Sequence, residues 1–134
     1  EWIKQGALLL LPAAVRFDDD FVISDDARLV VDAWPLYEAW SEEYGPQAYQ
    51  KIGIVGNQWH SLIEQGVMPA GKVQNIADIA TGALPPREND EEIILYSAGG
   101  MPIEDVAWAT EVYRNAVEKG IGVSLNLWDS PTLS

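Results

Sequence analysis

The stretch that decides the fold runs from Glu91 to Asp129 and reads EEIILYSAGGMPIEDVAWATEVYRNAVEKGIGVSLNLWD. Its beginning, Glu92–Ser97, is rich in isoleucine and leucine and predicts a short buried strand. The Ala-Gly-Gly of residues 98–100 then makes a turn, and a helix is expected from Pro102 to Lys119. Proline suits the first turn of a helix, and lysine suits the last turn because it interacts favourably with the helix dipole. We therefore expect a strand, a glycine turn and a helix in direct succession.

The helix expected after Pro102 has one apolar face. Its stripe of apolar and small residues recurs at spacings of three and four and consists of Ile103, Val106, Ala107, Thr110, Tyr113 and Val117. Gly120 follows the last lysine, as glycine often does where a helix ends. Beyond it, residues 123–128 alternate between apolar and polar and predict an edge strand.

Two further strands are expected nearer the N-terminus. Residues 6–15 form an apolar run without alternation, which is typical of a strand covered on both faces in a parallel sheet. Residues 27–32 form a second, partly β-branched run. Between them, the acidic residues 18–20 suit the start of a short helix. Residues 1–6 resemble the end of a helix that closes on a glycine.

Short helical segments separate the second strand from the last one. The expected helices and turns span residues 35–44, 47–53, 58–65 and 73–81, and a proline-rich connection spans residues 84–90. Strands and helices in this order, with continuous apolar strands, indicate an α/β layer structure. Because three or four strands are few for a complete doubly wound sheet, we expect half of a doubly wound, mostly parallel sheet with flanking helices.

The composition excludes several classes of function. The 134 residues suffice for one domain with a core, and 21 acidic against 8 basic residues give a net charge of −13. This charge argues against nucleic acid or an anionic membrane as a partner, because both require clustered lysine and arginine. No apolar run approaches the roughly 20 residues that cross a bilayer. The absence of cysteine excludes disulfides and thiolate sites, and we expect a cytoplasmic protein.

Other candidate residues have simpler explanations. With His60 as the only histidine and no cysteine, a zinc site is not expected. The acidic clusters at residues 18–20 and 25–26 lack the glycine and the terminal glutamate of a calcium loop, so they predict a solvated helix start. Ser97 has no histidine nearby in the sequence and no nucleophile-elbow context, which argues against a hydrolase. We therefore expect no metal at the site.

The strand ends are the best candidates for a binding site. Ligands of open α/β sheets lie beyond the carboxyl ends of the strands, and two ends qualify, at residues 11–14 and 96–100. Glycines at the second end let a ligand approach the backbone closely, and amides at the start of a helix favour anionic or carbonyl groups. The same two glycines also suffice to make the turn alone, and the spacing does not decide between these explanations.

Four segments of the chain match the motifs of one enzyme family. Ser97–Gly99 and Ile103–Tyr113 match a last strand that ends in Ser/Thr-x-Gly and continues into a helix of the form (I/L)EDVAxAxxVY. Residues 3–8, IKQGAL, resemble an hKPGAh segment, and residues 76–82, IADIATG, resemble an hxExxxG helix. On these segments the chain resembles the ornithine cyclodeaminase/mu-crystallin family of nicotinamide-dependent enzymes, over most of residues 1–125.

The resemblance implies a Rossmann-type fold that binds NAD or NADP. Residues 1–100 would be the C-terminal half of a dinucleotide-binding domain, and residues 101–134 a return helix and tail toward a substrate and dimerisation domain. The implied cofactor-binding residues are Pro12, Ala13, Ser97, Ala98 and Gly99, of which Ala98 and Gly99 would also contact the substrate. The resemblance further implies a homodimer, and apolar faces left uncovered in this chain predict that it self-associates.

The implied chemistry is hydride transfer at the α-carbon of a small amino or imino acid. The cyclodeaminase of this family closes an amino acid into a ring with loss of ammonia, and its relatives act as dehydrogenases or imine reductases. The cyclodeaminase carries an aspartate soon after an equivalent strand, whereas this chain reads PAAVRFD from Pro12 to Asp18. Asp18 is the candidate catalytic residue if the loop folds back. This departure leaves cyclodeamination and another amino- or imino-acid oxidoreductase both open.

A non-catalytic α/β interaction or dimerisation module is the alternative function. The chain contains neither the glycine-rich dinucleotide fingerprint nor the basic substrate residues of the family. We therefore expect part of an enzyme that is inactive by itself. A strand followed by G-x-G-x-x-G/A upstream of Glu1 would support the enzyme, and a start codon at Glu1 would support the module.

Overall fold

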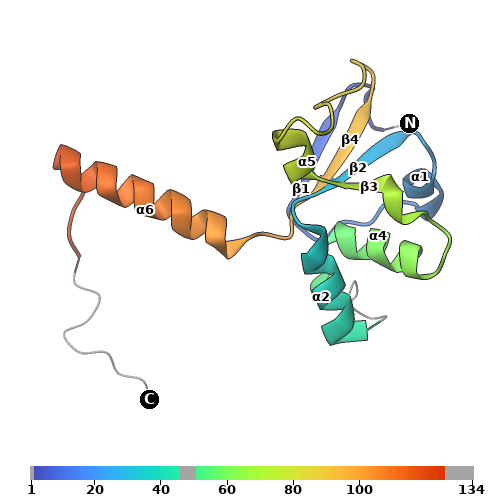
Figure 1. The fold of residues 1–134 in the computed structure, drawn as a ribbon, viewed down its shortest axis with the longest axis horizontal. Coiled ribbons are helices and arrows are strands. Elements are labelled where there is room, and N and C mark those ends of the chain that lie inside the picture. The colour runs from blue at the N-terminus through green and yellow to red at the C-terminus, as the bar shows by residue number, and fades with distance from the viewer. Residues whose placement is uncertain (1, 46–50, 126–134) are drawn as a thin grey trace. The chain divides into compact units, whose positions relative to one another are not determined.

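The computed structural model describes residues 2–45 and 51–125, which fall into two compact units (Figure 1). The first unit spans residues 1–100, and the second spans residues 101–134. The first unit alternates strands and helices, and the described part of the second contains one long helix. The first unit therefore holds the sheet at whose edge a ligand site is expected.

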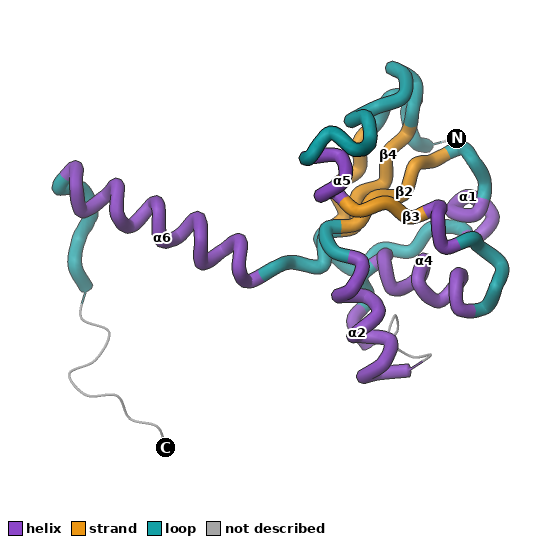
Figure 2. Tube along the Cα trace, in the orientation of Figure 1, coloured by secondary structure: helices purple, strands orange, loops and turns teal. Residues whose placement is uncertain are grey.

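Parallel strands form the sheet of the first unit. They are β1 (Leu8–Leu11), β2 (Ala27–Val31), β3 (Val73–Asn75) and β4 (Ile93–Ser97). Their order across the sheet is β1-β4-β2-β3, so β4 inserts between the first two strands. Figure 2 shows the strands of this unit in orange and its helices in purple. Residues paired at the strand ends are Leu11 with Ser97, Val31 with Ser97 and Val31 with Asn75. The carboxyl ends of these strands therefore lie along one edge of the sheet.

Helices α1 (Asp19–Ile23), α2 (Trp34–Tyr44) and α4 (Val55–Glu64) supply the core on one face of the sheet. A 3₁₀ turn, η2, follows at Ala70–Lys72. The core cluster joins the helical residues to alternate residues of the central strands and includes Val22, Tyr37, Trp59, Leu29, Val31 and Leu95. Leu9 and Leu11 of β1 pack against the same cluster.

Helix α5 (Ile76–Ala80) lies on the opposite face of the sheet and leaves part of that face open. Strand residues of this face and two residues of α5 line an apolar hollow. The strand residues are Leu8, Leu10, Val30, Ile94 and Tyr96, and the helix residues are Ile76 and Ile79. Leu8 and Leu10 are each 61% exposed. Parallel sheets normally bury such continuous apolar strands on both faces, so this hollow is an incompletely covered surface.

Local sequence signals explain where several elements begin and end. Asp18 caps α1, because its carboxylate accepts a hydrogen bond from the Asp20 amide at 3.3 Å. Pro35 lies in the first turn of α2, and Gly45 follows that helix with a φ of 61°. The predicted helices at residues 35–44 and 58–65 are thus confirmed, although α4 begins three residues earlier than expected.

The prediction for residues 73–81 is only partly correct. Residues 76–80 form the expected helix, but residues 73–75 form strand β3. The difference arises because Val73–Asn75 pair with Leu29–Val31 of β2, a partner that no local pattern reveals.

Two terminal predictions are wrong or lie beyond what is described. Residues 2–6 form a turn and no helix, and the Gly6 amide donates a hydrogen bond to the Glu91 carbonyl oxygen at 2.9 Å. Residues 123–125 form no strand, and the rest of that predicted strand lies outside the described residues. Most of the helix or turn predicted from residue 47 also lies outside them.

Helix α6 (Pro102–Lys119) makes up most of the described part of the second unit. Gly120 follows it in the left-handed conformation, with φ 61° and ψ 32°, and its amide donates to the carbonyl oxygens of Ala116 and Val117. None of the residues of α6 is buried, so its apolar stripe is exposed. The predicted helix and both of its ends are confirmed.

Candidate functional site

The carboxyl edge of the sheet gathers the residues that the sequence marks as cofactor contacts. Strand β1 leads into Pro12 and Ala13, and the neighbouring β4 leads into Ala98 and Gly99. The two loops meet where the Ala98 amide donates a hydrogen bond to the Leu11 carbonyl oxygen at 3.3 Å. Pro12 and Ala13 are exposed, and Ala98 and Gly99 are partly exposed. The structure therefore brings these predicted residues together.

Ser97, the last residue of β4, directs its side chain into the protein. It is fully buried, and its hydroxyl oxygen accepts a hydrogen bond from the Gly56 amide at 3.0 Å. The same oxygen lies 3.0 Å from the hydroxyl of Tyr37. Since Gly56 lies in the first turn of α4 and Tyr37 in α2, Ser97 ties the end of β4 to both helices. The Ser97 hydroxyl is thus engaged within the protein.

Asp32 follows β2 directly, and its buried carboxylate accepts three hydrogen bonds. The residue is 6% exposed. Its Oδ1 atom accepts from the Ala33 amide at 2.9 Å and from the Tyr37 hydroxyl at 3.0 Å. Its Oδ2 atom accepts from the Gly100 amide at 2.9 Å. The carboxylate therefore fastens the turn after β4 to the end of β2.

Tyr37 connects Ser97 and Asp32 from α2. Its ring is fully buried and meets Trp40 edge to face, with ring centroids 5.5 Å apart. Burial raises the pKa of the Tyr37 hydroxyl well above its usual value, and the nearby charge of Asp32 raises it further, against the opposing hydrogen bond from Ser97. The hydroxyl therefore stays protonated and donates to Asp32, which leaves Ser97 as the donor to the Tyr37 oxygen.

Two glycines allow this close packing. A Cβ atom on Gly56 would lie within 2.8 Å of three atoms of the Tyr37 ring. A Cβ atom on Gly99 would lie 2.9 Å from side-chain atoms of both Leu36 and Trp40 in α2. Gly99 of the predicted binding turn therefore also serves the packing of that turn against α2.

Asp18, the predicted catalytic residue, lies away from this edge. It caps α1 and lines a hollow with Ile3, Asp26 and Glu91, which precede β1, β2 and β4. These residues mark the amino ends of the strands, opposite the turn after β4. The structure does not bring Asp18 together with the predicted cofactor residues, and its catalytic role stays a prediction.

Sequence reasoning missed Asp32 and Tyr37. The prediction rested on the ends of the first and last strands and left out the end of the second. Asp32 follows that second strand directly, at the kind of position where ligands of open α/β sheets bind. Tyr37 gives no such signal, because Ser97 lies 60 residues away from it in the sequence.

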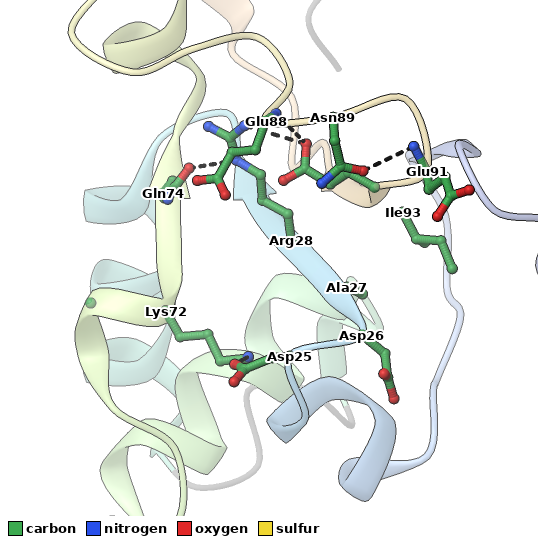
Figure 3. Close-up of a pocket in the computed structure, with 12 residues that line it drawn as sticks. Asp25, Asp26, Ala27, Arg28, Lys72, Gln74, Glu88, Asn89, Glu91 and Ile93 are labelled. Atoms are coloured by element: carbon green, nitrogen blue, oxygen red, sulfur yellow. Dashed lines mark hydrogen bonds and ion pairs between the residues drawn. The ribbon is translucent and has the colours of Figure 1, made fainter.

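A second, polar hollow lies at the amino ends of β2 and β4 (Figure 3). Its two basic side chains each pair with an acidic side chain of the same hollow. Lys72 Nζ lies 3.0 Å from Asp25 Oδ1, and Arg28 Nε donates to Gln74 at 2.7 Å. Arg28 also lies 3.6 Å from Glu92 Oε2. This mutual pairing favours a structural role for the hollow over ligand binding.

The described residues offer neither a metal site nor a membrane span. No group of three or more histidine, cysteine, aspartate or glutamate side chains within residues 2–45 and 51–125 could hold a metal ion. His60 is buried instead against Trp34, with ring centroids 5.2 Å apart, and lies 3.5 Å from Glu64. No helix in this part of the chain has the length and apolarity to cross a membrane.

Comparison with known proteins shows the family of this chain. Residues 1–120 match the model of the ornithine cyclodeaminase/mu-crystallin family. The N-((2S)-2-amino-2-carboxyethyl)-L-glutamate dehydrogenase of Staphylococcus aureus is 43% identical over 129 residues, which cover 96% of this chain and 34% of that protein. The chain thus spans about a third of the length of this relative.

Two solved structures share the fold. The Delta(1)-pyrroline-2-carboxylate reductase of Thermococcus litoralis, in complex with NADH and L-proline, has a TM-score of 0.60 and 26% identity, covering 92% of this chain and 35% of that chain. An archaeal alanine dehydrogenase dimer with bound NAD has a TM-score of 0.56 and 22% identity, covering 95% of this chain and 36% of that chain. The predicted Rossmann-type fold class is confirmed.

Proposed function

Because the chain belongs to the ornithine cyclodeaminase/mu-crystallin family, we propose that the whole protein is an NAD(P)-dependent oxidoreductase acting at the α-carbon of an amino or imino acid. The observation that carries this proposal is the 43% identity to a dehydrogenase of an N-substituted glutamate, which extends over 96% of the chain. The ordered turn after β4, held at the carboxyl edge of a parallel sheet, supports it.

The substrate proposed first is an N-(carboxyalkyl) amino acid related to N-(2-amino-2-carboxyethyl)glutamate. A bound nicotinamide cofactor would supply the acceptor for the hydride of the glutamate α-carbon, and the nitrogen would lose its proton as a C=N bond forms. Water then adds to this imine, and the C–N bond breaks to give a 2-oxo acid and a primary amine. L-Ornithine, the substrate of cyclodeamination, is the second candidate.

The residues of this chain would bind and orient a nicotinamide cofactor, NAD or NADP, which supplies the hydride acceptor. Pro12 and Ala13 after β1 and the turn Ala98-Gly99 after β4 are the proposed contacts. Since the Ser97 hydroxyl is engaged by Gly56 and Tyr37, we expect the turn to contact the ring and the substrate through its peptide groups.

The test uses the whole protein with NAD⁺ or NADP⁺ and, in parallel, N-(2-amino-2-carboxyethyl)-L-glutamate, L-ornithine, L-proline and L-alanine. Reduced nicotinamide formed together with a 2-oxo acid from the first substrate supports the proposal. Proline and ammonia from ornithine without lasting reduced cofactor identify a cyclodeaminase. No turnover and no NADH binding favour the non-catalytic interaction module, which would keep only the dimerisation role.

Asp18 stays the sequence-based candidate for the proton acceptor. If it acts in that role, Asp18→Asn lowers kcat by roughly 10²–10⁴-fold, because general base catalysis contributes about that much. The affinity for NADH, measured by fluorescence titration, stays unchanged. Unchanged rates remove Asp18 from the mechanism and agree with its position at the amino ends of the strands.

A homodimer is proposed for the whole protein, as in the archaeal alanine dehydrogenase dimer. Sedimentation velocity of the whole protein tests this assembly, and a monomer at all concentrations contradicts it.

A further inference from the structure

We propose that Asp32 and Tyr37 are positioning residues that hold the turn after β4 in the geometry required for hydride transfer. The inference rests on the proposed function, because it concerns the same turn, Ala98-Gly99. It adds two residues to which neither the sequence motifs nor the family resemblance assigns a role.

The carboxylate of Asp32 holds one end of the turn after β4. It is almost completely buried, and each of its oxygens accepts a hydrogen bond from a backbone amide, Ala33 for Oδ1 and Gly100 for Oδ2, both at 2.9 Å. Hydrogen bonds to an ionised acceptor are stronger than neutral ones. The Gly100 amide closes the turn from its far side, so Ala98 and Gly99 lie between two fixed points.

The other fixed point of the turn is Ser97, and Tyr37 links it to Asp32. The Ser97 backbone is fixed by the sheet, where its carbonyl oxygen accepts from the Asp32 amide at 3.2 Å. Its hydroxyl is held by the Gly56 amide and by the Tyr37 hydroxyl, both at 3.0 Å. The Tyr37 hydroxyl in turn lies 3.0 Å from Asp32 Oδ1. The two ends of the turn therefore share one connected network.

The ring of Tyr37 cannot move away to break this network. It is fully buried, and it lies so close to the backbone of Gly56 that no side chain fits there. On the outer side of the turn, Gly99 lies against Leu36 and Trp40 of the same helix. Helix α2 thus supports the turn both through packing and through the Tyr37 hydroxyl.

Such a network matters for hydride transfer because donor and acceptor carbons need close alignment. A displacement of about 1 Å costs on the order of 10²-fold in rate. The fixed turn leaves the residues Ala98 and Gly99 partly exposed at the edge. A loosened turn would therefore slow the chemical step more than it weakens cofactor binding.

The test compares Asp32→Asn and Tyr37→Phe in the whole protein with two matched controls, Asp78→Asn and Tyr44→Phe. Asp78 lies exposed in α5, and Tyr44 lies at the end of α2. We expect both network variants to lower kcat by about 10-fold or more, with the larger effect for Asp32→Asn. We also expect a larger primary isotope effect with substrate deuterated at the α-carbon, and a dissociation constant for NADH within about threefold of the original.

A network that is only structural would give a different result. Both variants would then melt at lower temperature, while kcat and the isotope effect would match those of the controls, and this outcome overturns the inference. If Asp32→Asn does not fold, Tyr37→Phe decides alone, because it removes one oxygen atom and keeps the ring. Absence of turnover in the unmodified protein overturns the proposed function and this inference together, whereas normal turnover with unaffected variants overturns this inference only.

Discussion

Gly56 lacks a side chain at the place where the Tyr37 ring lies against the backbone of α4. An added methyl group would lie within 2.8 Å of three ring atoms, and the ring is fully buried. We expect Gly56→Ala to lower the free energy of unfolding by roughly 1–3 kcal/mol, as overpacking of a core does. Urea unfolding measures the loss. Gly71→Ala is the control, because nothing lies within 4 Å of its new Cβ atom; equal stability of both variants would contradict the packing argument.

The buried hydroxyl of Tyr37 makes stability depend on pH in the alkaline range. Its pKa in the folded protein is raised above the ordinary value of about 10 that it has when unfolded. The folded state therefore keeps a proton that the unfolded state loses, so this stabilisation is fully present below about pH 10 and decreases as pH rises further. Above pH 10, the free energy of unfolding of the original protein should therefore fall by about 1.4 kcal/mol more per pH unit than that of Tyr37→Phe. Urea unfolding of both proteins from about pH 8 to about pH 11 tests this, and parallel curves would contradict it.

At the scale of elements, Arg28 joins β2 to β3 and to the segment before β4. Its side chain is 7% exposed, and it contacts Gln74 and Glu92, the latter 13% exposed. Glu92→Leu leaves the guanidinium buried without an opposite charge, which should cost about 3–5 kcal/mol of unfolding free energy. Arg28→Met combined with Glu92→Leu should cost less than Glu92→Leu alone, because no charge is then buried. Chemical denaturation measures both. In the exposed pair of Arg114 with Glu111, the corresponding Glu111→Leu change should cost about 0–1 kcal/mol.

The elements that the sequence predicts well carry their signals within their own residues. Helix α6 has a proline at its start, a lysine at its end and a left-handed glycine after it, and all three features are found in the structure. Strand β3 has three residues and is defined by its pairing with β2, so its sequence alone reads as the start of α5. The same limit applies to the site. The turn after β4 was recognisable from its glycines, whereas the support from Asp32 and Tyr37 depends on contacts between distant segments.

At the scale of the whole molecule, two apolar surfaces formed by the described residues are incompletely covered. One is the hollow beside α5, where Leu8 and Leu10 are exposed, and the other is the stripe of α6. Exposed apolar surfaces of this kind favour association, so we expect this chain by itself to self-associate as its concentration rises. Leu8→Lys combined with Leu10→Lys should shift the chain toward the monomer in sedimentation velocity, because each lysine places a charge in the hollow. Val67→Lys, an equally polar change at an exposed residue outside the hollow, should leave association unchanged. A monomeric unmodified chain would contradict the expectation. Undiminished association of the double variant would indicate that the stripe of α6, and not the hollow, makes the contact.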